Sequence, residues 1–289
     1  MNRYDYHQPD TLEEAFRLKK TIPDSLFISG GTDLMVRIKK RELSPRALIS
    51  LRSIPGLSGI ENGKIIRIGA MTSISDVLQN SLLYEKFPVL IDAAKFLGSI
   101  QIRNMATFGG NLCNGSPAAD MAPPLLVLEA KVRLQGGQKS RDLPLEKFFR
   151  GPGKTGLSPD EIMTDILLDP PEPDTHGVFL KKGRTKMDLA VASVAALIRT
   201  EGNRCFKARI AAGSVAPVPM RLLEVETLLE GSSFSRELLT EAQELAAKSV
   251  SPITDVRSTA DYRCHLVGVL LKRALEKLLD KEFGDRYRT

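Results

Sequence analysis

The sequence predicts a mixed α+β fold built from more than one compact unit, and three observations carry this prediction. Apolar runs of strand length, such as residues 26–29, end at glycine pairs, which is typical of strands that run into tight loops. Residues 74–82 and 89–96 instead carry apolar side chains at helical spacing. A proline-rich linker at residues 169–174 then separates this first part from a long strand pair followed by helices.

The length and the breaks in the pattern indicate how the chain is divided. A chain of 289 residues is long enough for two or three compact units. We expect a first unit at residues 1–55, a second at residues 56–170 and a third at residues 177–289. The third unit should be an antiparallel sheet with helices on one face.

The first two units contain most of the predicted elements. Thr11 is a suitable N-cap for a helix over residues 12–20, because acidic residues follow it in the first turn. We expect strands at residues 26–29, 47–51, 64–68, 131–135 and 161–168, helices at 74–82, 89–96 and 121–130, and loops at 106–120 and 148–153. Phe148 and Phe149 in the last loop belong either to the core, which is favoured, or to the cover of a ligand.

The third unit is predicted to begin with a strand and to end with a long helix. A strand at residues 178–182 precedes a hairpin of residues 190–200 and 205–212, and an amphipathic helix lies within 232–250. Ser258 is the expected cap of the last helix. The apolar stripe of this helix, at three- and four-residue spacing, is Tyr262, Leu266, Val269, Leu270 and Leu278.

The charge and the cysteines exclude several classes of function. The 41 basic and 35 acidic residues give a formal charge of +6, without an arginine-rich arm or a basic–aromatic pattern, so no nucleic-acid partner is expected. Cys113, Cys205 and Cys264 lack metal-ligand spacing, which argues against a metal site or an iron–sulfur cluster within this chain and fits a reducing cytoplasm. No apolar run has the length of a membrane span, and the N-terminal residues lack the apolar core of a signal peptide.

Two glycine segments are the strongest indication of a binding site. Segment 27–34 follows a strand and contains Gly30 and Gly31, and segment 106–120 contains Gly109 and Gly110. Glycine lets the backbone turn sharply and approach a ligand closely, and consecutive N–H groups in such a turn bind anions. The second segment adds polar side chains, namely Thr107, Asn111, Asn114 and Ser116.

Each segment alone is compatible with an ordinary glycine turn, whereas the pair favours two contacts to one long polyphosphate ligand. Neither segment has the Walker or the Rossmann spacing, so those two nucleotide sites are disfavoured.

The order of several short motifs gives the sequence a resemblance to a known family. The motifs are residues 9–15, Gly30-Gly31-Thr32-Asp33-Leu34, residues 68–72, Gln101-Ile102-Arg103-Asn104, residues 106–120, Asp188-Leu189-Ala190, and residues 211–217 and 251–257. In this order, over nearly the whole chain, they resemble the FAD-binding medium subunit of the molybdenum hydroxylases, the flavoprotein of the carbon monoxide dehydrogenase and xanthine dehydrogenase family. The resemblance implies two FAD-binding subdomains of the PCMH type and a C-terminal domain of the carbon monoxide dehydrogenase flavoprotein type.

The resemblance also implies FAD as cofactor, bound without a covalent link, and a set of cofactor-binding residues. These are Phe27, Ile28, Ser29, Gly30, Gly31, Thr32, Asp33, Leu34, Leu97, Thr107, Phe108, Gly109, Gly110, Asn111, Asp120, Met163 and Lys181. Asp120 would accept a hydrogen bond from a ribityl or ribose hydroxyl, or alternatively cap the helix that follows. Lys181 would favour the negative charge of reduced flavin, or alternatively be a surface lysine. No catalytic residue and no metal ligand is assigned.

The implied function is electron transfer within a complex. The partners would be a molybdopterin-binding large subunit and a 2Fe–2S small subunit, in a dimer of heterotrimers, with electrons passing through FAD to an external acceptor. Two alternatives remain open, a stand-alone FAD-binding carrier or maturation protein and a self-contained flavin oxidase. The oxidase is the weaker alternative, because no substrate base is found near the motifs.

Overall fold

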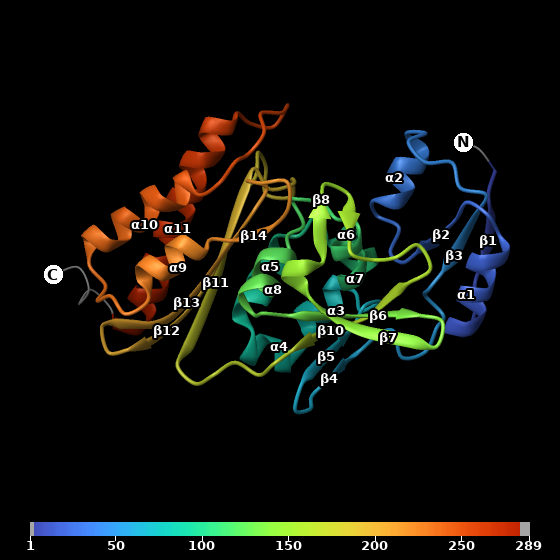
Figure 1. The fold of residues 1–289 in the computed structure, drawn as a ribbon, viewed down its shortest axis with the longest axis horizontal. Helices are drawn as coiled ribbons and strands as arrows, with labels where there is room; N and C mark the ends of the chain where they lie inside the picture. The colour runs from blue at the N-terminus through green and yellow to red at the C-terminus, as the bar shows by residue number, and fades with distance from the viewer. Residues whose placement is uncertain (1–2, 284–289) are drawn as a thin grey trace.

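The computed structural model describes residues 3–283, so residues 1–2 and 284–289 of the predicted first and third units lie outside it. Figure 1 shows the chain running along the longest axis of the molecule, with the N-terminal elements at one end and the C-terminal helices at the other. Helices and sheets are mixed throughout, and the last sheet is antiparallel. The predicted fold class is therefore confirmed.

The first elements form a small parallel sheet with two helices. They are β1 (Asp5–His7), α1 (Leu12–Thr21), β2 (Ser25–Ile28), α2 (Leu34–Lys39) and β3 (Ala47–Ser50), and the sheet order is β1-β3-β2. The Thr11 Oγ1 accepts a hydrogen bond from the Glu14 N–H at 3.1 Å, so the predicted cap of α1 is confirmed. All four residues of the central strand β3 are buried.

The middle elements form a five-stranded sheet, order β4-β5-β10-β6-β7, that is covered by helices. Its strands are β4 (Ile60–Glu61), β5 (Ile66–Gly69), β6 (Lys131–Gly136), β7 (Lys139–Pro144) and β10 (Ile162–Leu168). The helices are α3 (Ile74–Gln79), α4 (Ser81–Lys86), α5 (Pro88–Phe96), α6 (Ile100–Met105), α7 (Phe108–Cys113) and α8 (Ala122–Val127), with a single 3-10 turn η1 (Leu145–Lys147) and the short hairpin β8 (Phe149–Gly151) and β9 (Lys154–Thr155). Phe148 and Phe149 are buried in this core, which confirms the favoured interpretation.

Three predictions for the middle elements are wrong. The loop expected at 148–153 contains the strand β8, which pairs with β9. The single helix expected at residues 74–82 is divided at Asn80, whose side chain accepts a hydrogen bond from the Leu83 N–H at 3.1 Å and starts α4 as a new helix. The loop expected at 106–120 contains the helix α7, because the Thr107 side chain caps a short run that ends at Cys113.

The last elements form the antiparallel sheet β11-β12-β13-β14 with three helices. The bounds are β11 (Thr175–Lys182), β12 (Ala192–Glu201), β13 (Arg204–Gly213), β14 (Met220–Arg221), α9 (Leu223–Leu229), α10 (Arg236–Lys248) and α11 (Ala260–Phe283). Alternate residues of β12 belong to different cores: Ala195 and Leu197 pack with the middle elements, whereas Val194 and Ala196 pack with α9, α10 and α11. Because both faces are covered, this strand is apolar without alternation.

The start and the buried stripe of α11 differ from the prediction. The helix begins at Ala260, and the Thr259 Oγ1 accepts a hydrogen bond from the Tyr262 N–H at 3.3 Å, so Thr259 rather than Ser258 takes the capping position. Tyr262 is 47% exposed and Val269 is only partly buried. The buried stripe is Leu266, Val267, Leu270, Leu271, Ala274, Leu275, Leu278 and Leu279. Two facing elements, the sheet and α10, widen this stripe beyond one line of residues.

Candidate functional site

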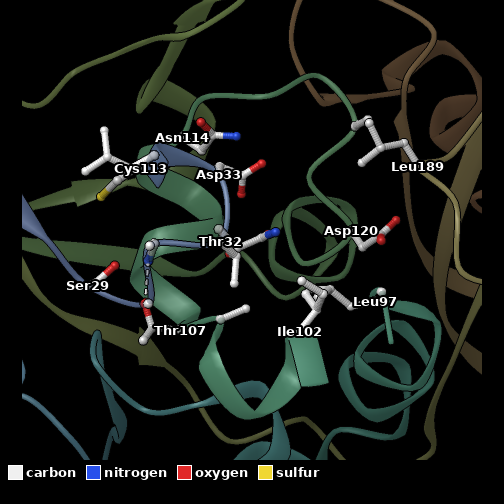
Figure 2. A pocket seen from close by; sticks show the side chains of 18 of the residues that line it. Ser29, Thr32, Asp33, Leu97, Ile102, Thr107, Cys113, Asn114, Asp120 and Leu189 are labelled. Carbon is white, nitrogen blue, oxygen red and sulfur yellow. Dashed lines mark hydrogen bonds between the residues drawn. The ribbon is translucent and has the colours of Figure 1, made fainter. Parts of the chain in front are cut away.

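A cavity of about 450 Å³ lies where the three parts of the chain meet, and this volume is in the range of small-molecule sites. Figure 2 shows how the side chains converge from both glycine segments, from α6 and from the region after β11. The predicted site residues that line it are Phe27, Ser29, Gly30, Gly31, Thr32, Asp33, Leu34, Leu97, Thr107, Gly110, Asn111 and Asp120. Segments far apart in the sequence therefore meet at this one cavity.

Five predicted residues lie behind or beside this cavity. Ile28 and Phe108 are buried in the adjoining cores, and Gly109 packs against Ala70. Met163 lines a second cavity of about 150 Å³, which shares Phe27, Ser29, Gly110 and Cys113 with the first. Lys181 lies behind Asp120.

Sequence reasoning missed about half of the lining. The additional residues are Arg37, Gly98, Ile102, Ala106, Cys113, Ala118, Gly153, Met187, Asp188 and Leu189. The last three follow β11 and carry no local binding pattern, although Asp188 and Leu189 belong to one of the motifs behind the resemblance. Of the other polar side chains of the second glycine segment, Asn114 lines the cavity and Ser116 does not. The Ser116 Oγ instead accepts a hydrogen bond from the Ala118 N–H at 3.1 Å.

The first glycine segment presents unoccupied backbone donors to the cavity. Within residues 3–283, no protein acceptor is found for the N–H groups of Gly30, Gly31 and Thr32. Gly31 has a φ of +71°, a conformation that favours glycine. A Cβ added to Gly30 would lie 1.9 Å from the carbonyl oxygen of Met105 at the end of α6. The segment therefore needs both glycines, and its free N–H groups suit an anion.

The second glycine segment has a different role from the one predicted. Gly109 and Gly110 are helical and make no sharp turn. Their N–H groups are used within the protein: Gly109 donates to the Ala70 carbonyl at 2.8 Å and Gly110 to the Thr107 Oγ1 at 3.1 Å. A Cβ added to Gly110 would lie 2.7 Å from the Ser29 Oγ. Here glycine is needed because the two segments pack closely, so the prediction of an anion-binding turn at this position is wrong.

A buried ion pair closes the other end of the cavity. The Lys181 Nζ donates to the Asp120 Oδ2 at 2.6 Å and to the Phe96 carbonyl at 3.1 Å. The side chains of Lys181 and Asp120 are 3% and 6% exposed. Lys181 is thus not a surface residue, and Asp120 is not a helix cap, since α8 begins after Met121 without a side-chain cap.

One oxygen of this pair remains available. The Asp120 Oδ1 is buried and has no hydrogen-bond partner, while Asp120 itself lines the cavity. Buried carboxylate oxygens without a partner are costly, so this oxygen suits a donor on a bound molecule. Leu97 and Ile102 lie close to it in Figure 2 and give that end an apolar wall.

Burial raises the pKa of Asp120 to about 6, although Lys181 opposes the shift. Because the pKa is higher in the folded than in the unfolded chain, the folded state binds more protons between about pH 4 and pH 6. We therefore expect the Asp120 contribution to stability to fall as the pH rises through this window. Unfolding free energies of the apo wild type and Asp120→Asn, measured by denaturant from pH 4 to 7, should differ by a pH-dependent amount. A pH-independent difference would contradict a raised pKa.

No group of three or more histidine, cysteine or acidic side chains in residues 3–283 is arranged to hold a metal ion. The same residues contain no helix with the length and hydropathy of a membrane span. Burial raises the pKa of the Cys113 thiol to about 12, so this cavity residue is a thiol rather than a thiolate at neutral pH.

Comparison with known proteins places this site in a class. Residues 2–170 match the family described as the FAD binding domain in molybdopterin dehydrogenase, and residues 178–278 match the CO dehydrogenase flavoprotein C-terminal domain. The molecule is thus a flavoprotein with FAD as its cofactor. The chain belongs to the FAD-binding medium subunits of the molybdenum hydroxylases, and it is an oxidoreductase subunit.

The similarity to known relatives and solved structures extends over almost the full length of this chain. The chain is 33% identical to the carbon monoxide dehydrogenase medium chain of Hydrogenophaga pseudoflava, covering 94% of this chain and 96% of that one. It is 30% identical to the xanthine dehydrogenase FAD-binding subunit of Escherichia coli O157:H7, covering 94% of both. The structure of carbon monoxide dehydrogenase from H. pseudoflava superposes with a TM-score of 0.94 at 32% identity, covering 97% of this chain and 98% of that one.

Proposed function

We propose that this chain accepts electrons from an iron–sulfur partner and passes them through FAD to an external acceptor. The relatives are named as medium chains or FAD-binding subunits of such dehydrogenases, which supports a large and a small partner subunit. We assign these partners as a molybdopterin-binding large subunit and a 2Fe–2S small subunit, in a dimer of heterotrimers. Three free cysteines agree with a cytoplasmic location.

One observation carries the proposal: free backbone donors and a free carboxylate oxygen lie in one cavity. The N–H groups of Gly30, Gly31 and Thr32 match the diphosphate of FAD, and the Asp120 Oδ1 matches an N–H or a hydroxyl of the flavin half. When bound, FAD supplies a redox ring that takes up electrons and releases them to the acceptor.

The remaining residues orient the cofactor and shield it. Leu97 and Ile102 give the ring end an apolar wall, and the smaller cavity beside Met163 is apolar enough to receive the adenine. Lys181 acts through Asp120: its hydrogen bond fixes the carboxylate, and the carboxylate compensates its charge at neutral pH. Lys181 is therefore a positioning residue in this proposal.

The dependence on partners tests the function. We expect the purified chain to hold FAD that acid precipitation releases intact, and to oxidise none of the organic substrates of the native complex by itself. Addition of the large and small subunits should restore substrate-dependent reduction of the flavin absorbance. The proposal is wrong if the FAD-loaded chain alone turns over an organic substrate, because it would then be a self-contained oxidase.

A further inference from the structure

Arg263 is a buried charged residue that does not line the cofactor cavity. Its side chain lies near the start of α11 and is only 2% exposed. The guanidinium Nη1 donates to the carbonyl oxygens of Val191 and Ser214, both at 3.0 Å, and Nη2 donates to the Asp255 Oδ1 at 2.7 Å. One guanidinium therefore joins the residue before β12, the residue after β13 and the segment before α11.

The contact to Val191 fixes the end of the loop 183–190, which forms part of the cavity wall. The Val191 N–H donates to the Lys182 carbonyl at 2.7 Å and closes this loop between β11 and β12. Lys181, the partner of Asp120, lies just before the loop. None of residues 183–189 is buried, so the position of the loop depends on the hydrogen bonds at its ends. The loop residues that line the cavity are Met187, Asp188 and Leu189.

The contact to Ser214 leads to the second glycine segment, residues 106–120. Ser214 has a φ of +65°, in the left-handed region that residues with a side chain rarely adopt. Its N–H donates to the Pro117 carbonyl at 2.8 Å, while its own carbonyl accepts from Arg263. Backbone strain of this kind persists only where the surrounding contacts fix it. Because Ala118, next to Pro117, lines the cavity, the guanidinium also supports this second part of the wall.

Asp255 holds the guanidinium in place and compensates its charge. The Asp255 N–H donates to the Ser258 carbonyl at 3.0 Å, and the Ser258 N–H donates back to the Asp255 carbonyl at 3.2 Å, so residues 255–258 form a closed turn. The Arg257 Nη2 donates to the Asp255 Oδ2 at 2.6 Å and lowers the pKa of this carboxyl, which is therefore ionised at neutral pH. A buried charge without a partner is strongly destabilising, so this carboxylate keeps Arg263 in the interior.

We propose that Arg263 is a positioning residue for the cofactor site: by holding Val191 and Ser214 it fixes the loop 183–190 and the segment 106–120 against bound FAD. This inference rests on the proposed function and adds to it a residue that acts on the cofactor without touching it. An apolar side chain of similar length fills the same space but binds none of the three acceptors. The loop then loses an anchor, and the bound flavin becomes more accessible to water.

Arg263→Met in the full chain tests this role. We expect about tenfold weaker FAD binding, the size typical of a lost hydrogen bond from a charged group. Titration of the apoprotein with FAD measures this affinity. Iodide should also quench the fluorescence of the flavin that remains bound more strongly than in the wild type, because the loop 183–190 shields it less. This second readout reports on the cavity wall and does not change when the chain is merely less stable.

Val267→Ala is the matched control, since Val267 is 0% exposed in the same helix and packs in the C-terminal core. It should lower the melting temperature and leave FAD affinity and iodide quenching unchanged. Arg263→Lys keeps the charge but loses the planar fork of donors, so it should lie between the wild type and Arg263→Met, and it serves as the test if Arg263→Met does not fold. If the folded Arg263 variants bind and shield FAD as Val267→Ala does, the positioning role is wrong while the proposed function stands. If even the wild-type apoprotein binds no FAD, both proposals fail.

Discussion

Gly30→Ala is expected to weaken FAD binding about 100-fold. The added Cβ would lie 1.9 Å from the Met105 carbonyl oxygen and 3.1 Å from the Ala106 Cα, so the backbone must move. Overpacking of this kind costs about 1–3 kcal/mol, and its upper end corresponds to about 100-fold in affinity. Titration of the apoprotein with FAD, followed by flavin fluorescence, measures the effect.

Gly63→Ala provides a matched control for this substitution. Gly63 is not in the left-handed region, and an added Cβ would have its nearest neighbour, the Ile65 carbonyl oxygen, at 3.3 Å. Its FAD affinity should equal that of the wild type. Equal affinity in Gly30→Ala would show that the first glycine segment does not hold the cofactor.

Lys181→Met is expected to destabilise the chain by about 3–5 kcal/mol, because it leaves a buried carboxylate without its partner. Asp120 would then be driven toward its protonated form, so the loss should shrink as the pH falls. FAD occupancy should decrease as well, since the Asp120 side chain loses the hydrogen bond that fixes it at 2.6 Å. Denaturant unfolding at several pH values measures the loss of stability. The flavin-to-protein ratio of the purified variant measures the FAD occupancy.

Lys182→Met is the control for Lys181→Met, because Lys182 is the neighbouring lysine and is exposed. It should change the free energy of unfolding by less than about 0.5 kcal/mol. The double variant Lys181→Met with Asp120→Asn should recover part of the stability, because neither charge remains buried. FAD occupancy should stay low in the double variant. Wild-type stability of Lys181→Met alone would refute the buried pair.

The sequence located the first glycine segment because its chemistry is local. A strand followed by Gly30 and Gly31 predicts a loop whether or not the rest of the chain is known, and the structure adds the reason why Gly30 admits no side chain. The same local reasoning failed at Gly109 and Gly110. Glycine pairs are common in turns, but here Thr107 caps a helix and the missing side chains serve close packing on Ala70 and Ser29.

The other half of the cavity depends on contacts that no local pattern encodes. Lys181 meets Asp120 across 61 positions of sequence, because β11, which carries Lys181, packs against α5. Met187 and Leu189 reach the cavity only because the last sheet packs on α5 and α8. Resemblance to a family named Asp120 and Lys181, whereas their hydrogen bond and the free Oδ1 required the folded chain.

The central claim is that electrons enter this flavin from an iron–sulfur partner, and anaerobic rapid mixing tests it most directly. The 2Fe–2S subunit, reduced chemically and freed of excess reductant, is mixed with the oxidised FAD-loaded chain, and the visible absorbance of both is followed. The flavin absorbance should bleach as the iron–sulfur absorbance returns, and this exchange should be absent with the apoprotein. A complex that forms while both absorbances stay unchanged would contradict the account.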